Sequence, residues 1–489
     1  MTKRKTVFLT GASGRMGHEG FLQLLKRRDR YDLVVLVQPT APDRKRMAPY
    51  DGEPGVRIVW GDLTRYEDVL DCVNGADYVL HVGGLVSPLA DHQPKRAMEV
   101  NLGSVRNIVR AIRSQEDPDR CRLVYIGTVA QTGDRMPPLH WGRTGDPIYI
   151  SEFDHYALSK TLAEREVIES GLKYWVSLRQ TGIAHLGLLE IQDPIMFHVP
   201  LNGAFEWVTV GDSGRLLANV CEEDVPEEFW RRVYNIGGGA SCRVTNYDFA
   251  ARMYHAVGLP DFRRVTEPNW FATRNFHGQW YADSDVLERY LHFRTETVDD
   301  FIGAIRRHVG WRRAAMRLVP AAAIKARLRK IARGPGGTLN WIVRGDGERV
   351  RAYFGSEDAW RDIPGWDRFE IVRPAPAPVC SHGYDEDKPR GEIGLDDITS
   401  AAAFRGGDCL STGMVRGNLS TRLRWRCAFG HEFEASPALV LLGGHWCPHC
   451  MPGPWNYEAE AVHNPFLAQV CRSRTCKRCD DCAARTRSA

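Results

Sequence analysis

Thr-Val-Phe-Leu-Thr-Gly-Ala-Ser-Gly-Arg-Met-Gly, at residues 6–17, is the stretch that decides the fold. Its first five residues form a short apolar run, which is typical of a strand buried in a parallel sheet. Three glycines follow at positions 11, 14 and 17, and residues 16–28 then have the apolar spacing of a helix. Glycine is needed where a backbone turns tightly against a pyrophosphate, and a helix N-terminus offers free N–H groups to its oxygens. This order of strand, loop and helix predicts a dinucleotide-binding site.

Short apolar runs continue beyond this loop at regular intervals. We expect strands at 33–37, 56–60, 78–82, 123–126 and 176–178, with helices between most of them, notably at 97–113 and 156–170. Strands that alternate with helices predict an α/β fold with a doubly wound parallel sheet, the Rossmann arrangement. From about 185 to 310 the alternation becomes irregular and rich in aromatic residues, so we expect a small substrate-binding cap there, with most of the aromatic side chains in the core. A late strand and helix at 280–293 would close this region.

Composition restricts the class of protein. The 489 residues are 43% hydrophobic and 26% charged, as in an ordinary soluble protein, and allow two or more domains. A net charge of +4 is too small to imply a nucleic-acid partner. No apolar run approaches the roughly 18 residues of a membrane span, and no signal-peptide pattern precedes the first strand. We therefore expect a cytoplasmic protein.

The character of the chain changes at residue 312. Eight Arg or Lys residues and no acid lie between 312 and 333, and a Pro/Ala stretch follows at 374–378. We expect three regions: a cofactor and substrate domain at 1–311, a basic helix and linker at 312–379, and a cysteine-rich module at 380–489. The basic helix could bind nucleic acid or an anionic membrane surface. We favour a helix that packs on the domain with its charges in water.

The cysteines indicate a metal site in the last region. Cys427 and His431, with Cys447 and Cys450, supply four ligands for a closed tetrahedral zinc site, with His449 as the rival of His431. The surrounding residues resemble treble-clef zinc modules, which implies a separate zinc-binding module. A second set, Cys471, Cys476, Cys479 and Cys482, has spacing that suits a metal, but we favour free or redox-active thiols there.

A tyrosine and a lysine at helical spacing indicate acid–base chemistry. Tyr156 and Lys160 lie four residues apart, on one face of the expected helix. A free phenol has a pKa of about 10, and a neighbouring ammonium lowers it towards the range in which proton transfer is efficient. Tyr156 would then exchange a proton with a carbonyl or alcohol, and Lys160 would also hold the nicotinamide ribose. Thr128, just past the fifth strand, can offer its hydroxyl to the same substrate oxygen.

The choice between NAD and NADP depends on a few charges. An acid at the end of the second strand would bind the ribose 2′-OH, but Gln38 stands there. Arg15 in the glycine loop and the basic residues 44–46 could neutralise a 2′-phosphate, or could simply coat a solvated loop. We predict NADP, with NAD as the alternative.

Residues 5–310 resemble the extended short-chain dehydrogenases, the NAD(P)-dependent epimerase/dehydratase superfamily. The motifs that carry the resemblance are the glycine loop, Gly61-Asp62-Leu63, His81-Val82-Gly83-Gly84, Val100-Asn101-Leu102-Gly103, Thr128, Tyr156 with Lys160, and Arg179-Gln180-Thr181-Gly182. The resemblance implies a homodimer, catalytic roles for Thr128, Tyr156 and Lys160, and an ordering role for Asn101. It implies cofactor contacts from Gly11, Ser13, Gly14, Arg15, Met16, Gly17, Gln38, Asp62, Leu63, Val82, Gly83, Gly84, Lys160, Gln180 and Ile183.

Departures from the family pattern narrow the chemistry. Sugar-nucleotide dehydratases of this family have Asp-Glu after the threonine, where this chain has Val129-Ala130. Leu217 stands where sugar-nucleotide members carry a phosphate-binding arginine, although Arg215 is close. We therefore predict an NAD(P)-dependent dehydrogenase or reductase that transfers a hydride between nicotinamide and a carbonyl or secondary alcohol. The alternatives are a sugar-nucleotide epimerase and a dinucleotide-sensing scaffold that binds a partner or nucleic acid. Sensor-type relatives commonly lose the catalytic tyrosine, so its presence favours the enzyme.

Overall fold

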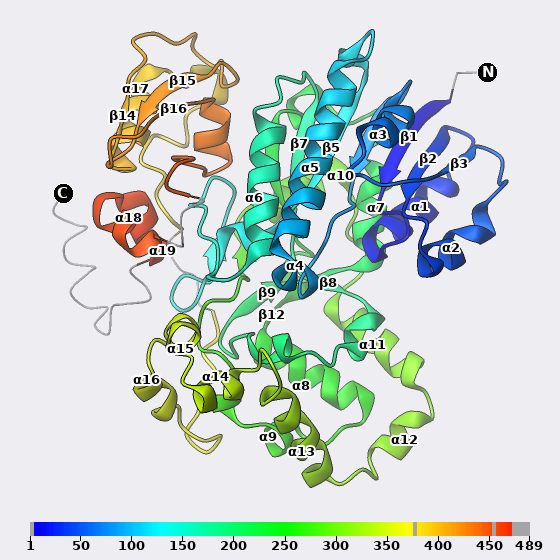
Figure 1. Cartoon of the computed structure of the whole chain (residues 1–489), viewed down its shortest axis with the longest axis vertical. Helices are drawn as coiled ribbons and strands as arrows, with labels where there is room; N and C mark the ends of the chain where they lie inside the picture. The colour runs from blue at the N-terminus through cyan, green and yellow to red at the C-terminus, as the bar shows by residue number, and fades with distance from the viewer. Residues whose placement is uncertain (1–3, 375–378, 452–455, 472–489) are drawn as a thin grey trace.

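A seven-stranded parallel sheet forms the centre of the protein. This computed structural model describes residues 4–374, 379–451 and 456–471 (Figure 1). The strand order is β11-β7-β5-β4-β1-β2-β3, and every strand pairs in parallel with its neighbours. The strands are β1 (Lys5–Thr10), β2 (Tyr31–Val37), β3 (Val56–Trp60), β4 (Tyr78–His81), β5 (Arg122–Thr128), β7 (Trp175–Gln180) and β11 (Arg232–Ile236). The predicted doubly wound sheet is confirmed. Chain order reverses between β1 and β4, so a crevice is expected at the carboxyl ends of these two strands.

Helices cover both faces of the sheet because neighbouring residues of a strand point in opposite directions. On β1, Phe8 joins a core with Val105 and Ile108, whereas Val7 and Leu9 join another with other helices. The first face is covered by α3 (Tyr66–Val73), α5 (Pro94–Arg113) and α6 (His155–Ile168), and the second by α1 (Arg15–Leu25), α7 (Val210–Asn219) and α10 (Ser284–Leu291). The short helices α2 (Ala41–Met47) and α4 (Leu89–His92) lie in connecting loops.

The edge strand β11 did not stand out in the sequence. Arg232 and Asn235 interrupt its apolar pattern. The strand expected at 280–283 exists as β13 (Trp280–Tyr281), but it pairs with β6 (Trp141–Gly142) outside the main sheet. Neither β11 nor β13 has the long apolar run that distinguishes a central strand. The sequence therefore could not show which of these two segments belongs to the main sheet.

The cap is built from short strand pairs and helices between residues 183 and 309. It contains β8 (Ile183–Ala184), β9 (Ala204–Glu206), β10 (Val208–Thr209), β12 (Arg243–Thr245), α8 (Asn246–Val257), α9 (Phe262–Val265) and α11 (Val298–Val309). Strand β10 pairs with β8, and β12 pairs with β9. Most of the aromatic side chains of this region are buried, as expected, including Phe197, Phe205, Trp230, Trp270, Phe271 and Tyr281.

The basic region continues the cap. The expected helix divides into α12 (Arg312–Met316) and α13 (Ala321–Ala332), because the residue before Pro320 disfavours helical backbone. Leu328 and Ala332 of α13 pack with Phe197 and Trp270 in one core. Further helices follow as α14 (Thr338–Arg344), α15 (Gly347–Phe354) and α16 (Glu357–Arg361). In the described residues, no helix is long and apolar enough to cross a bilayer.

The C-terminal segment has its own small antiparallel sheet. It contains α17 (Leu395–Phe404), β14 (Asp408–Cys409), β15 (Leu423–Arg426), β16 (Glu432–Ala435), α18 (Tyr457–His463) and α19 (Pro465–Cys471), with the strand order β14-β15-β16. This segment packs beside α6, and Leu439 and Leu441 share one core with Ile168 (Figure 1). Of the second cysteine set, Cys471 is buried at the end of α19. Cys476, Cys479 and Cys482 lie outside the described residues.

Candidate functional site

The glycine loop joins β1 to α1 and lies against the end of β4. Gly11 has a φ of +75°, and a Cβ there would lie 2.8 Å from the Gly83 nitrogen. A Cβ on Gly17 would overlap the Gly11 carbonyl oxygen, so α1 could not approach the loop so closely. The Thr10 hydroxyl accepts hydrogen bonds from the backbone N–H groups of Val82 (3.0 Å) and Gly83 (2.8 Å). The structure thus brings the predicted cofactor loop and the 82–83 backbone together.

The predicted adenine end of the site lies past β2 and β3. Gln38 follows β2 and is exposed. One carboxylate oxygen of Asp62 accepts both the N–H and the hydroxyl of Thr64 at 2.8 Å, and the other lies 3.4 Å from Arg96. The side chain of Leu63 lies beside Gly83.

The arginines predicted to bind a 2′-phosphate each make a different contact in the structure. Arg46 donates to the Ser13 carbonyl oxygen of the glycine loop at 3.0 Å. Arg44 lies over the Trp60 ring, 4.7 Å from its centroid. Arg15 forms an ion pair with Glu190 of the cap, at 3.7 Å, and both side chains are largely exposed. Arg46 of α2 therefore reaches the glycine loop through a side-chain hydrogen bond.

Thr128, Tyr156 and Lys160 meet at the carboxyl end of β5. Thr128 ends β5 and is buried, and its hydroxyl oxygen accepts the Ala130 N–H at 3.2 Å. Its side chain is close enough to the Tyr156 phenol to lower the pKa of that phenol. Tyr156 lies in the first turn of α6, which Asp154 caps by accepting the N–H of Ala157. Lys160 lies one turn further, and its Nζ donates to the Ile126 carbonyl oxygen at 2.6 Å.

The expected lowering of the Tyr156 pKa does not occur in this arrangement. Burial raises the pKa of the Tyr156 phenol to about 12, although the hydrogen bond with Thr128 opposes the rise. Burial lowers the pKa of the Lys160 ammonium to about 7, and the charge of Glu164 opposes that change. The Lys160 ammonium is directed to the Ile126 carbonyl and lies over the Tyr125 ring, 4.2 Å from its centroid. The phenol is therefore protonated at neutral pH.

Asn101 connects the helix α5 to the same site. Its side-chain N–H groups donate to the Leu85 carbonyl oxygen (2.9 Å) and to the Ser159 hydroxyl (2.8 Å). Its amide oxygen accepts the Leu85 N–H at 2.8 Å, and a Cβ on Gly84 would lie 2.8 Å from that oxygen. Ser159 in turn donates to the Tyr156 carbonyl oxygen at 2.8 Å. Asn101 thus links the 84–85 loop to the turn that carries Tyr156.

Gln180 and Ile183 complete the predicted cofactor contacts. Gln180 ends β7 and is buried, with its side-chain N–H donating to the Thr181 carbonyl oxygen at 3.1 Å. Ile183 lies in β8, opposite Val208 of β10. Both residues are near the end of β7, which pairs with β5 so that Gln180 is in register with Thr128.

A cluster of aromatic side chains lies beside Val129, the residue that follows Thr128. Val129, which follows Thr128, packs in one cluster with Phe205 and Tyr281, against which Trp207 and Phe276 also pack. All four aromatic side chains come from the cap. Apolar packing therefore holds Val129 against the cap.

Sequence reasoning missed a buried ionic network behind the site. Glu164 of α6 accepts hydrogen bonds from Arg179, Ser177, Gln131 and His445, and all five side chains are buried. Glu164 stands one turn after Lys160, and this spacing was a usable signal. Nothing local could have indicated His445, which is 281 residues away.

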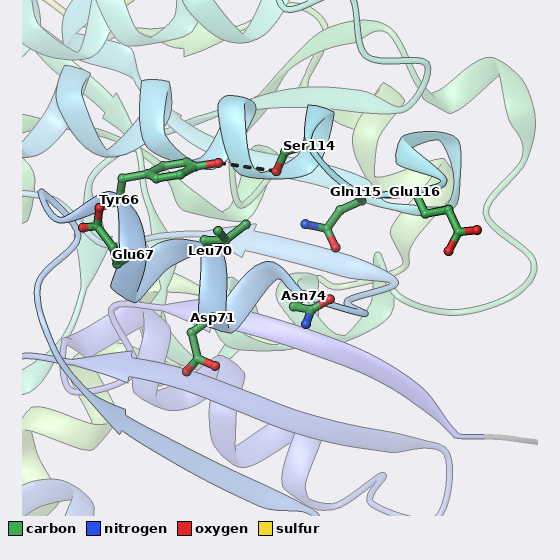
Figure 2. A pocket seen from close by; sticks show the side chains of 8 residues that line it. All are labelled: Tyr66, Glu67, Leu70, Asp71, Asn74, Ser114, Gln115 and Glu116. Carbon is green, nitrogen blue, oxygen red and sulfur yellow. Dashed lines mark hydrogen bonds between the residues drawn. The ribbon is translucent and has the colours of Figure 1, made fainter.

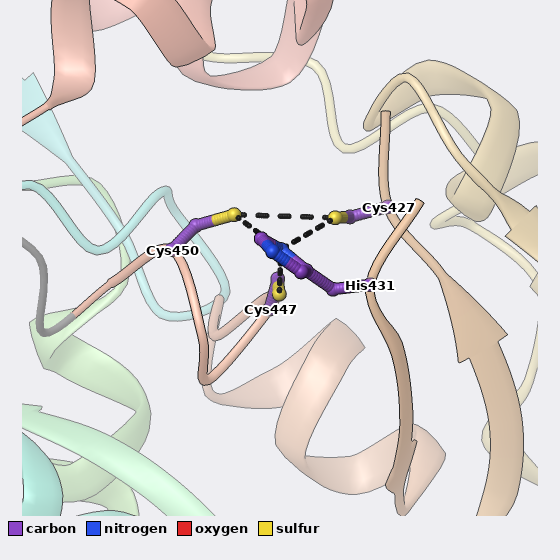
Figure 3. Close-up of side chains that lie close together, drawn as sticks. All are labelled: Cys427, His431, Cys447 and Cys450. Carbon is purple, nitrogen blue, oxygen red and sulfur yellow. Dashed lines mark hydrogen bonds between the residues drawn. The ribbon is translucent and has the colours of Figure 1, made fainter. Parts of the chain in front are cut away.

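The four predicted metal ligands also come together (Figure 3). The His431 Nδ1 lies 3.5, 3.8 and 3.4 Å from the sulfurs of Cys427, Cys447 and Cys450, and the Cys427 and Cys450 sulfurs are 3.9 Å apart. Tetrahedral zinc with ordinary Zn–S and Zn–N bonds requires S–S and S–N separations of roughly 3.5–3.8 Å. The donor types and these separations are therefore close to those of a tetrahedral zinc site. His449 is exposed and lies outside the cluster, with its ring 5.4 Å from that of His431.

One groove of the protein lies away from these residues. Figure 2 shows it between α3 and the end of α5, with a volume of about 600 Å³. It is lined by Tyr66, Glu67, Leu70, Asp71, Asn74, Ser114, Gln115 and Glu116. None of the predicted site residues lines it.

The arrangement can be compared with known proteins. Residues 7–181 match the profile of the NAD dependent epimerase/dehydratase family. The matched range contains the glycine loop, Thr128, Tyr156 and Lys160 but ends before the metal cluster.

Two curated relatives match parts of this chain. Human 3 beta-hydroxysteroid dehydrogenase type 7 is 30% identical over 171 residues, which are 34% of this chain and 45% of the relative. UDP-glucose 4-epimerase from Rickettsia bellii is 26% identical over 110 residues, 22% of this chain and 32% of the relative. The match thus spans less than half the length of each relative.

Solved structures confirm the fold. The DesIV dTDP-glucose 4,6-dehydratase of Streptomyces venezuelae, with NAD bound, superposes with a TM-score of 0.50 at 21% identity and covers 62% of this chain and 96% of its own. At this identity the likeness establishes the Rossmann-type fold alone.

Proposed function

We propose that the protein is an NAD(P)-dependent oxidoreductase that transfers a hydride between nicotinamide and a carbonyl or secondary alcohol. The observation that carries this proposal is the convergence of Thr128 and the Tyr156 phenol at the carboxyl end of β5. Lys160 lies one turn away on α6, and the glycine loop lies on the same edge of the sheet. The bound nicotinamide would supply or accept the hydride.

Tyr156 would supply the proton. Because burial raises its pKa to about 12, the phenol carries its proton at neutral pH and is ready to act as general acid in carbonyl reduction. Thr128, which already contacts the phenol, would hold the same substrate oxygen. Lys160 would bind the nicotinamide ribose, and Asn101 would keep the turn that carries Tyr156 in place.

The surroundings of the site favour an apolar substrate over a sugar nucleotide. Val129, the residue after Thr128, packs with aromatic side chains of the cap, among them Phe205 and Tyr281. Leu217 is fully buried in the core. Arg215 is engaged by the Phe293 carbonyl oxygen and by Asp212, so it is not free for a phosphate. Val129 and Ala130 offer no acid or base for the loss of water.

We further propose NADP as the preferred cofactor and zinc as the metal. Arg46 contacts the glycine loop, and Gln38 leaves no carboxylate to repel a 2′-phosphate. Three cysteines and His431 would fill all four positions of a tetrahedral zinc ion, which suits a structural role because no position is left open for a substrate.

A screen of carbonyl and alcohol compounds tests the function. We expect oxidation of NADPH in the presence of apolar ketones, at least about tenfold faster than NADH at equal concentration, because each charge-assisted phosphate contact is worth about 1.5–3 kcal/mol. The measurement is the absorbance of the reduced nicotinamide, with Arg46→Ala as the matched variant that loses preference for NADPH. Turnover of UDP-sugars alone would favour the epimerase instead.

A further inference from the structure

A loop of the C-terminal segment reaches the interior of the catalytic region. Residues 443–445 follow a buried apolar turn at Ala438–Leu442. The Gly443 carbonyl oxygen accepts a hydrogen bond from Arg179 at 2.6 Å. His445 is 1% exposed, and its Nε2 lies 3.0 Å from a carboxylate oxygen of Glu164. The loop therefore contributes two partners to groups on β7 and α6.

The close approach requires the two glycines. Gly444 has a φ of +70°, and a Cβ there would overlap the Asp146 carbonyl oxygen. A Cβ on Gly443 would lie 2.7 Å from the Leu439 carbonyl oxygen and 3.2 Å from the Ile168 side chain of α6. Such close contacts with fixed backbone leave room for glycine only.

A continuous chain of hydrogen bonds runs from His445 to the proposed active site. The Glu164 oxygen that faces His445 also accepts the Gln131 side-chain N–H at 2.9 Å. The Gln131 amide oxygen accepts the Thr128 backbone N–H at 3.1 Å. All four side chains are at most 5% exposed. Because each atom is excluded from water, loss of one partner cannot be repaired by solvent without opening the core.

We propose that the C-terminal segment completes the active site and that His445 is a positioning residue for Thr128, acting through Glu164 and Gln131. The inference rests on the proposed function, because it assigns Thr128 a role in turnover. The metal ligand Cys447 lies two residues after His445, so the metal cluster anchors the loop from which His445 reaches Glu164. The segment beyond the family match is then part of the catalytic unit.

Two substitutions at one position separate this role from simple packing. His445→Leu removes the partner of Glu164, and we expect kcat to fall about 10- to 100-fold, since small displacements at a reacting group cost up to about 10²-fold. His445→Gln can still donate an amide N–H, and we expect it to recover most of kcat. The dissociation constant of the cofactor, measured by quenching of protein fluorescence, should change less than about twofold in both, because the glycine loop is not touched. His463→Leu, at an exposed histidine of α18, is the control.

A double-mutant cycle with Thr128→Ala gives the decisive readout. If His445 acts through Thr128, His445→Leu should lower the residual kcat of Thr128→Ala by less than about threefold. An equal loss in both backgrounds, an unchanged kcat in His445→Leu, or equal losses in the Gln and Leu variants would overturn the proposal. If the Leu variant does not fold, His445→Asn, with its shorter reach, replaces it. Failure of the proposed function is a different result, because wild-type protein would then turn over no carbonyl or alcohol.

A second inference comes from an independent feature, the short helix α12. Trp311, Ala314, Ala315 and Leu318 recur at helical spacing and are all exposed, with Trp311 80% and Leu318 83% exposed. The opposite side holds the helix to the cap, where Arg313 donates to the His255 carbonyl oxygen at 3.2 Å. The helix therefore turns its apolar face, residues 311, 314, 315 and 318, outward.

The charge around this face is positive. Between 312 and 333, Lys325 is the single cation with a carboxylate partner in the described part of the chain, and that partner is Glu267. Arg312 and Arg317 flank the apolar face and are exposed. A tryptophan and a leucine bordered by arginines suit the boundary between anionic headgroups and acyl chains. A nucleic acid would pair with the arginines but would leave Leu318 in water.

We propose that the apolar face of α12 docks on the surface of an anionic lipid bilayer. With vesicles of phosphatidylcholine containing about 30 mol% phosphatidylserine, we expect at least about fivefold more sedimented protein than with phosphatidylcholine alone, and release at high salt. The double variant Trp311→Ser/Leu318→Ser should lose this binding, whereas Val343→Ser, at another exposed apolar residue, should keep it. Equal sedimentation of the wild type and the double variant would overturn the proposal. If the wild type is a dimer and the double variant a monomer in light scattering, the apolar face of α12 binds a second copy of this chain and the proposal is also overturned.

Discussion

Tyr156→Phe is expected to lower kcat by about 10²- to 10⁴-fold, the range that a positioned general acid contributes. The substitution removes one oxygen and its proton and leaves the ring, so packing against the cluster that includes Ala130 and Tyr149 is preserved. Cofactor binding should be unchanged because the glycine loop, Asp62 and Lys160 are untouched. The measurement is kcat for the best substrate of the NADPH screen, with the dissociation constant of NADPH determined in parallel.

Tyr66→Phe is the matched control for this variant. Tyr66 lies in the groove of Figure 2, where its phenol contacts the Ser114 hydroxyl at 3.4 Å, far along the chain from the proposed site. It should retain full activity. Unchanged turnover in Tyr156→Phe would remove Tyr156 from the mechanism, and a loss of NADPH binding would mean that the substitution disturbed the cofactor site instead.

Removal of a metal ligand is expected to have the largest effect on stability. Cys447→Ser should abolish zinc binding and lower the free energy of unfolding by at least about 3 kcal/mol, since structural zinc contributes folding energy directly. Cys427 and Cys447 are at most 5% exposed, and they share a core with Trp425 and Phe433. The measurements are metal content by mass spectrometry and thermal unfolding, and prolonged chelation of wild-type protein should give the same change.

Three further substitutions sharpen this test. His449→Ala should keep one zinc per chain, whereas His431→Ala should lose it, because only the His431 ring lies among the three sulfurs. Cys409→Ser changes a partly buried cysteine of the same small sheet outside the cluster and should also keep the metal. Full zinc content in Cys447→Ser would contradict the assignment. If His445 positions Thr128 through Glu164 and Gln131, loss of the metal should also lower kcat.

Local patterns were sufficient for most of the sheet. Six of the seven strands were predicted within two residues at either end, because each is a short apolar run followed by a turn or a helix. The glycine loop was equally readable, since Gly11 and Gly17 meet steric conditions that no other residue satisfies. The spacing of the four metal ligands also predicted their convergence. The strand β11 was not predicted, because polar residues interrupt its apolar pattern. The basic region was predicted as one helix, and Pro320 explains why it forms two.

Electrostatic surroundings were harder to predict. The spacing of Tyr156 and Lys160 correctly placed both on one helix, but the effect on the phenol depends on where the ammonium points. In the folded protein the Lys160 ammonium donates to the Ile126 carbonyl oxygen, and burial dominates the pKa of Tyr156. The burial of a group is a property of the whole core, which a four-residue spacing does not contain.

The sequence by itself determined the doubly wound sheet, the position of the glycine loop, the Thr128–Tyr156–Lys160 set and the four residues of the candidate metal site. These features depend on residues close in the chain or on strict backbone conformations. Only the tertiary structure decided that the loop at 443–445 lies against α6 and β7 and that His445 reaches Glu164. The physical reason is that a buried carboxylate takes its hydrogen-bond partners from whatever backbone packs beside it, and the partner here is separated by 281 residues from the helix that it serves.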